Sequence, residues 1–262
     1  MPALRYSQRC KRNTNGKRKG HEPTKKRKQK ESGEQQSRHD TDPVSQLLQP
    51  HLLAGHHSRG YLPHLKVEGG TYWVTLRLHD SLPQEVLKKW EEERKDWEKQ
   101  QRAQKVAPQE IAQQWKRLYT KRMHAYLDAG MGACWLKRDD IGGLVANALR
   151  FFEGKRYDLH AWVVMPNHGH VMVTPRDKWT LSSILHSWKS YTATEANRIL
   201  GRVGEPFWQI EAYDHLVRDD KEFYLICEYT INNPVSVGLC AKPEDWKFSS
   251  AFAQADSGAT HT

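Results

Sequence analysis

The pattern of apolar and polar positions predicts strand structure in three parts of the chain. Residues 69–79, GGTYWVTLRLH, alternate between apolar and polar positions and carry aromatic and β-branched side chains. Residues 157–175 contain two apolar runs on either side of Pro166 and Asn167, which predicts two strands joined by a turn. Residues 207–218 predict a short fourth strand followed by a turn.

Segments with helical periodicity separate and follow these strands. They are residues 80–104, 108–128, 138–154 and 179–200, and a last segment that begins at Asp219 or Asp220. Gly154 and Gly201 are typical residues for ending the third and fourth helices, and Pro234 is expected to end the fifth. The third helix is expected to supply core residues, namely Leu144, Leu149, Phe151 and Phe152.

The order of these elements indicates the fold class. Strand, helices, strand, strand, helix and strand succeed one another, and a final helix follows. This is the βαββαβ order of a ferredoxin-like α+β fold, in which an antiparallel sheet is flanked by helices. We therefore predict one such domain over residues 61–252.

Charge is concentrated at the N-terminus. Of 262 residues with a net charge of +10, the first 50 hold 13 Lys and Arg against 5 Asp and Glu. We predict that residues 1–60 form a disordered basic tail, because so few apolar residues cannot offset the entropy of ordering. Such a tail would attract nucleic-acid phosphates, although an ordinary solvated tail is the alternative. Residues 253–262 are predicted to be a flexible C-terminus.

Cysteine usage and hydropathy bear on the compartment. The four cysteines are widely spaced and contain no C-x-x-C pair, which favours a reducing, cytoplasmic setting. No apolar run approaches the length of a membrane span, so no membrane partner is expected.

Two histidines lie at the start of an apolar strand. His168 and His170 alternate with Gly169, so their side chains are expected on one face of the strand. Two neutral imidazoles and an oxygen ligand could hold Mg²⁺ or Mn²⁺, and such an ion could polarise a phosphoryl oxygen. Because the chain has 14 histidines, a chance pair without a metal is the alternative.

The last helix carries a tyrosine and an amide on one face. Tyr229 and Asn233 are four residues apart, so a phenol and an amide oxygen would be presented together. The alternatives are a boundary tyrosine and an asparagine that caps the helix. Tyr191, followed by Glu195 four residues later, is a rival pair of nucleophile and ligand.

Four motifs resemble one known family. AWVVMPNHGHVMV, FWQIEAYDHLVRDDKEF, YTINNPVSVGL and EDWKFSSA occur in the order and with the spacing of the REP-associated tyrosine transposases, which are members of the HUH nuclease superfamily. The resemblance covers residues 69–252 and implies the HUH endonuclease fold. It implies Tyr229 as nucleophile and His168, His170 and Asn233 as ligands of a divalent metal ion. The chain departs from the family at Gly169, where a bulky hydrophobic residue is usual, and at residues 85–128, which are longer than a compact core needs.

The resemblance also implies an activity. Such a protein would cut single-stranded, hairpin-containing DNA through a 5′-phosphotyrosine intermediate and rejoin it to another 3′-hydroxyl. A catalytically inactive DNA-binding module and a metal phosphohydrolase that uses bound water are the alternatives. Residues 85–128 could contact DNA or a partner helix, but an amphipathic cover for the sheet is favoured. The sequence leaves open whether the chain acts as a monomer or a homodimer.

Overall fold

The structure, a computed structural model, describes residues 56–58, 63–65 and 67–252. Two short strands, β1 (His56–Ser58) and β2 (Pro63–Leu65), pair antiparallel at the start of this part. The strand at His56–Ser58 therefore lies inside residues 1–60, which were predicted to be a disordered tail, and corrects that boundary. The predictions of a disordered tail before His56 and of a flexible C-terminus after residue 252 lie outside the described residues.

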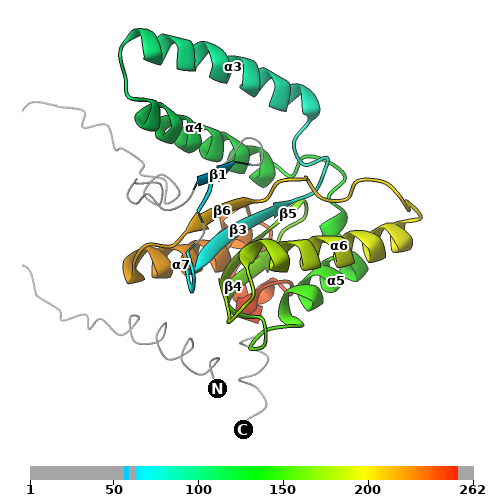
Figure 1. The fold of residues 1–262 in the computed structure, drawn as a ribbon. Coiled ribbons are helices and arrows are strands. Elements are labelled where there is room, and N and C mark those ends of the chain that lie inside the picture. Colours follow the sequence, from blue (N-terminus) through cyan, green and yellow to red (C-terminus); the bar gives the residue numbers. More distant parts are fainter. Residues whose placement is uncertain (1–55, 59–62, 66, 253–262) are drawn as a thin grey trace, which may run out of the picture. The chain divides into compact units, whose positions relative to one another are not determined.

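The central sheet has four strands, β3 (Tyr72–Arg77), β4 (Tyr157–Val164), β5 (His168–Pro175) and β6 (Tyr213–Leu216). Their order across the sheet is β4-β5-β3-β6, and every neighbouring pair is antiparallel. This arrangement, drawn in Figure 1, confirms the predicted ferredoxin-like α+β class.

Five helices follow the predicted segments closely. They are α3 (Gln84–Ala103), α4 (Pro108–Asp128), α5 (Asp139–Arg150), α6 (Leu181–Leu200) and α7 (Asp220–Ser236). The Thr180 hydroxyl accepts from the Ser183 amide at the start of α6, and Asp219 accepts from the Glu222 amide at 2.8 Å at the start of α7. None of the helices in the described part combines the length and apolar composition needed to cross a bilayer.

The last helix extends further than predicted. We expected α7 to end at Pro234, but it continues to Ser236. A proline deep in a helix removes a hydrogen bond to the preceding turn, whereas one so near the C-terminus still leaves room for the closing bonds. The Val237 amide donates to the carbonyl of Asn233 at 3.3 Å, and the Leu239 amide donates to that of Pro234 at 2.8 Å. Asn233 therefore lies inside the helix and is not its cap.

One face of the sheet is apolar and is covered by α5 and α6. Its core contains Val74, Leu76, Val171, Val173, Val145, Leu149, Ile184 and Trp188. Phe151, which we expected in this core, is 73% exposed. Because successive helical residues differ by about 100°, Phe151 points roughly opposite to the buried Leu149.

The EDWKFSSA motif protects an edge of the sheet. The Val164 amide at the end of β4 donates to the carbonyl of Phe248 at 2.8 Å, and the Trp162 amide donates to the Ser250 hydroxyl at 3.1 Å. The Trp246 indole donates to the carbonyl of Val164 at 2.9 Å. Bonds made by an edge strand within its own chain are unavailable for pairing with another chain, so this motif is structural.

A buried carboxylate joins β6 to α7. Glu222 accepts from His215 Nε2 at 3.0 Å, from the Arg218 amide at 2.7 Å and from the Arg218 guanidinium. Burial alone would raise the pKa of Glu222, but the hydrogen bonds from His215 and Arg218 outweigh it and lower that pKa to about 2.

We therefore expect Glu222→Gln to lower the free energy of unfolding at pH 7 by about 1–3 kcal/mol. Because the pKa of the folded state lies below the ordinary value, this contribution is complete above about pH 4.5 and fades as the pH falls towards 2. Urea denaturation at pH 7 and pH 3 measures it, and Glu228→Gln, at an exposed position of α7, is the control. Equal effects of the two substitutions at pH 7 would contradict the prediction.

Candidate functional site

The two histidines of β5 lie on the face of the sheet opposite the apolar core. His168 pairs in register with Arg77 of β3, and His170 pairs with Thr75. The two imidazole rings are 4.8 Å apart between centroids, and each residue is at most 1% exposed. The strand periodicity thus places both side chains on one face, as the sequence predicted.

Asn167 orients the ring of His168. The side-chain amide of Asn167 donates from Nδ2 to the carbonyl of Met131 at 2.9 Å, so its Oδ1 is the atom that faces His168 Nδ1, at 2.8 Å. An amide oxygen can only accept, so Nδ1 of His168 carries the proton and Nε2 carries a lone pair. No residue of the described part donates a hydrogen bond to that buried Nε2. The ring of His168 is therefore fixed in an orientation that leaves the Nε2 lone pair without a partner in the described part. The sequence analysis did not identify Asn167 as the residue that fixes it.

His170 is enclosed by neighbours on the same face. Its Nδ1 lies 3.0 Å from the Thr75 hydroxyl, and its ring stacks on Trp73 with centroids 5.0 Å apart. Between the histidines, a Cβ at Gly169 would come within 3.2 Å of the carbonyl oxygen of Val163. That close approach gives a physical reason for glycine at this position.

The final helix brings Tyr229 to the histidines. Its ring centroid is 5.7 Å from that of His170 and 5.6 Å from that of Trp73. Asn233 follows one helical turn later and is 1% exposed. Neither polar atom of its side-chain amide has a hydrogen-bond partner within the described ranges. A buried amide without partners costs free energy, and coordination of a metal ion by its oxygen would offset part of that cost.

A third histidine, missed by the sequence reasoning, comes from α4. His124 is 4% exposed, and its Nδ1 lies 3.4 Å from the Tyr229 hydroxyl. The His124 ring is 5.5 Å from that of His170 between centroids. The buried face of α4 covers this side of the sheet, so the favoured interpretation of residues 85–128 as a cover for the sheet describes the α4 part. Of the α3 residues only Trp90 is buried, and that helix packs against α4. The sequence did contain one indication of the role of His124, because that residue lies among the buried positions of the amphipathic helix α4.

All three imidazoles are neutral. Burial lowers the pKa of His168 to about 3, with further lowering by His124 and Arg77. Burial, together with Arg77, lowers the pKa of His124 to about 4. Burial also lowers the pKa of His170 well below the ordinary value, and His168 and His124 add to this effect. A neutral imidazole keeps the lone pair that a metal ligand needs.

The rival tyrosine is on the other side of the sheet. Tyr191 of α6 is 55% exposed and lines a cavity with Phe151 and Phe152, beyond the helix layer that covers the apolar face. Glu195 pairs with Arg198 at 2.8 Å. The structure therefore brings Tyr229, and not Tyr191, to the histidine pair.

Within the described ranges, no group of three or more His, Cys, Asp and Glu side chains is arranged to hold a metal ion. A cation bound by His168 and His170 would thus need a ligand of another type, and the candidate on α7 is the buried amide of Asn233, which has no hydrogen-bond partner in the described part. Amide oxygens are suitable ligands for hard divalent cations.

A buried histidine pair on an antiparallel sheet, with the ring of a tyrosine on α7 close to it, is the arrangement that the resemblance to single-tyrosine transposases implied. The sequence profile of the family described as "Transposase IS200 like" matches residues 143–233, a range that contains His168, His170 and Tyr229 and ends at Asn233. A REP-associated tyrosine transposase of Escherichia coli (strain K12) is 28% identical over 94 residues. The resemblance to REP-associated tyrosine transposases is thus confirmed.

These similarities have a limited extent. The alignment to the Escherichia coli protein covers 36% of this chain and 53% of that protein, so the chain spans about half the length of this curated relative. Among solved structures, a REP-associated tyrosine transposase bound to a REP hairpin is 17% identical, with a TM-score of 0.42. That comparison covers 78% of this chain and 87% of the other.

Proposed function

We propose that this protein is a metal-dependent strand transferase that cuts single-stranded, hairpin-containing DNA with Tyr229 as nucleophile. The observation that carries the proposal is the position of Tyr229, whose ring lies 5.7 Å from that of His170 and whose hydroxyl lies 3.4 Å from His124. The matching family profile and the Escherichia coli relative support the reaction class.

The residues present fit a divalent cation. His168 offers the lone pair of Nε2, His170 offers a neutral ring beside it, and Asn233 offers a buried amide oxygen. These three side chains would hold Mg²⁺ or Mn²⁺, which would supply Lewis-acid polarisation of a phosphoryl oxygen. Asn167 would keep His168 in the tautomer that such a role requires.

In the proposed reaction, the Tyr229 oxygen attacks the phosphorus of a phosphodiester and the bond to the 3′-oxygen breaks. The products are a 5′-phosphotyrosine and a free 3′-hydroxyl, which takes up the proton lost by the phenol. Attack by another 3′-hydroxyl reverses these steps and joins strands, so no external energy source is needed. Neutral His124 hydrogen-bonds to the Tyr229 hydroxyl and orients it for attack.

The test is a covalent-trapping assay on the full chain with Mg²⁺ or Mn²⁺. A hairpin oligonucleotide with a single-stranded flank is labelled at its 3′ end, so that a 5′-phosphotyrosine retains the label on the denatured protein. A labelled adduct supports the proposal. Strand cleavage that leaves free 5′-phosphate ends without an adduct would favour a phosphohydrolase that uses water. Salt-dependent DNA binding without cleavage would favour an inactive module.

A prediction on metal affinity follows from the role given to Asn167. Replacing it with alanine removes the acceptor that fixes the proton on His168 Nδ1. We expect Asn167→Ala to weaken Mn²⁺ binding by about tenfold to a hundredfold, as measured by calorimetry without DNA. Asn232→Ala, at a half-buried position next to Asn233, is the control. Unchanged Mn²⁺ affinity in Asn167→Ala would show that this orientation is unimportant.

A further inference from the structure

Arg77 is a buried cation inside the candidate site. Arg77 is the last residue of β3 and is 5% exposed. It pairs in register with His168 on the neighbouring strand β5, so the two side chains lie on the same face of the sheet. No carboxylate of the described residues lies within ion-pair distance of its guanidinium. Removing a charge from water without an opposite charge beside it is costly, so such an arrangement calls for an explanation.

The hydrogen bonds that Arg77 does make are weak. One terminal nitrogen lies 3.5 Å from the Tyr119 hydroxyl and 3.2 Å from the sulfur of Met123, and the other lies 3.4 Å from the main-chain carbonyl of Glu211. Its buried Nε has no partner among the residues that the structure describes. By contrast, Arg218 makes bonds as short as 2.5 Å to Glu222. The hydrogen-bonding capacity of the Arg77 guanidinium is therefore only partly used, because Nε has no partner and the bonds made by the two terminal nitrogens are long or go to sulfur.

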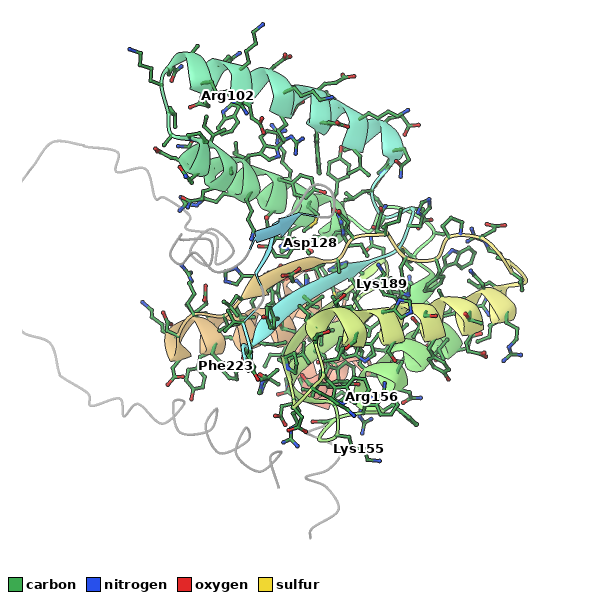
Figure 2. All side chains as sticks on the ribbon, viewed as in Figure 1. Arg102, Asp128, Lys155, Arg156, Lys189 and Phe223 are labelled. Atoms are coloured by element: carbon green, nitrogen blue, oxygen red, sulfur yellow. The ribbon has the colours of Figure 1, made fainter. Side chains whose placement is uncertain are left out.

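A second cation, Lys189, lies close enough to Arg77 for the two charges to interact. Lys189 of α6, labelled in Figure 2, donates to the carbonyls of Gln209 and Ile210 at 2.5 and 2.7 Å. Burial lowers the pKa of Lys189 to about 8, and the charge of Arg77 contributes to this shift. The charge of Glu211 raises the same pKa and so partly offsets this effect. Because the histidines are neutral, the positive potential near Arg77 comes from these two cations, and an anion bound to Arg77 would neutralise it.

We propose that Arg77 is a substrate-binding residue that contacts a non-bridging oxygen of the DNA phosphodiester beside His168. This inference rests on the proposed function and adds a protein group that neutralises the phosphate. A guanidinium fork matches two phosphate oxygens, and such charge-assisted bonds are stronger than those it makes now. The phosphate would replace the contacts to Tyr119 and Met123, so binding would require α4 to shift.

A purely structural role for Arg77 predicts different behaviour. If its guanidinium serves to hold α4 against the sheet, its removal should destabilise the chain. If it serves the substrate, a methionine of similar length should leave the chain as stable or make it more stable, because an uncompensated buried charge is removed. Stability and DNA affinity should then change in opposite directions.

The experiment places Arg77→Met and Arg77→Lys in a Tyr229→Phe background, so that binding is measured without cleavage. Fluorescence anisotropy with a labelled hairpin oligonucleotide should show about tenfold to a hundredfold weaker binding for Arg77→Met. The slope of log affinity against log salt concentration should become shallower by about 0.7, the value for one lost phosphate contact to a single strand. Arg77→Lys should lie in between. Arg102→Met is the matched control, because Arg102 is exposed at the far end of the α3–α4 hairpin (Figure 2).

A substrate with single methylphosphonate linkages locates the contact. At the contacted position, one neutral linkage should weaken binding by the Tyr229→Phe protein that retains Arg77. The same linkage should have little further effect on binding by the protein that also carries Arg77→Met.

Two outcomes would overturn the inference. One is equal DNA affinity with and without Arg77→Met, and the other is a melting temperature that Arg77→Met lowers by about 5 °C or more. In either case adduct formation by the unmodified chain would still support the proposed function. Failure of that chain to bind any single-stranded hairpin would overturn both.

Discussion

Replacing Tyr229 with phenylalanine is expected to abolish the covalent protein–DNA adduct. The substitution removes only the hydroxyl, which lies 3.4 Å from His124, and keeps the ring that packs against Trp73 and His170. Without the nucleophile there is no phosphotyrosine, so the rate of strand cleavage should fall by about a thousandfold or more. The 3′-labelled hairpin assay with Mn²⁺ measures both the adduct and the cut strand.

Tyr191→Phe is the matched control for this prediction. Tyr191 is 55% exposed on α6, on the other side of the sheet from the histidines, so its hydroxyl should be dispensable. We expect wild-type adduct formation and an unchanged melting temperature for this variant. An adduct that persists in Tyr229→Phe and disappears in Tyr191→Phe would transfer the nucleophile to α6, and the proposed site would be wrong.

The second large effect is expected at His168. Its Nε2 is buried, carries a lone pair and has no hydrogen-bond donor in the described part of the chain, so under the proposed function we expect it to be a metal ligand. We expect His168→Gln to weaken Mn²⁺ binding by at least about a hundredfold and to reduce DNA cleavage with it. Calorimetry with Mn²⁺ alone gives the affinity, and the labelled hairpin gives the cleavage rate.

Two measurements separate loss of the metal from loss of the fold. His186→Gln, at an exposed position of α6, should leave Mn²⁺ binding and cleavage unchanged. His168→Gln should retain a cooperative thermal transition without metal, since glutamine can still bond to Asn167. A folded His168→Gln variant that binds Mn²⁺ as tightly as the wild type would exclude this histidine as a ligand.

Local patterns in the sequence identified most elements of the fold. Two apolar runs on either side of Pro166 and Asn167 predicted the strand pair over residues 157–175, and the two-residue period of a strand placed His168 and His170 on one face. The predicted end of α7 at Pro234 was wrong, because we assumed that a proline ends a helix. Pro234 lies so close to the C-terminus of α7 that the helix can still close with the bonds to Asn233 and Pro234. Phe151 was misplaced because apolar character alone does not say which side of α5 faces the sheet.

The sequence analysis missed three residues of the site, because their roles depend on contacts with residues distant in the sequence. His124 meets Tyr229 across 105 residues of chain, and nothing in the sequence around either residue indicates that contact. Arg77 reads as an ordinary polar position in an alternating strand, and only the sheet register shows that it faces His168. Asn167 reads as a turn residue, and its second role depends on a carbonyl contributed by Met131.

The sequence by itself therefore determined the four strands of the central sheet, the segments that form α3 to α7, the fold class and the shared face of the histidine pair, but not the short strands β1 and β2. Each of these follows from side-chain periodicity or element order along a continuous stretch of backbone. Only the tertiary structure decided which tyrosine meets the histidines, which imidazole nitrogen is left without a partner, and that a guanidinium is buried among them. Those properties depend on burial and on neighbours distant in sequence, and both exist only after the sheet and its covering helices have packed together.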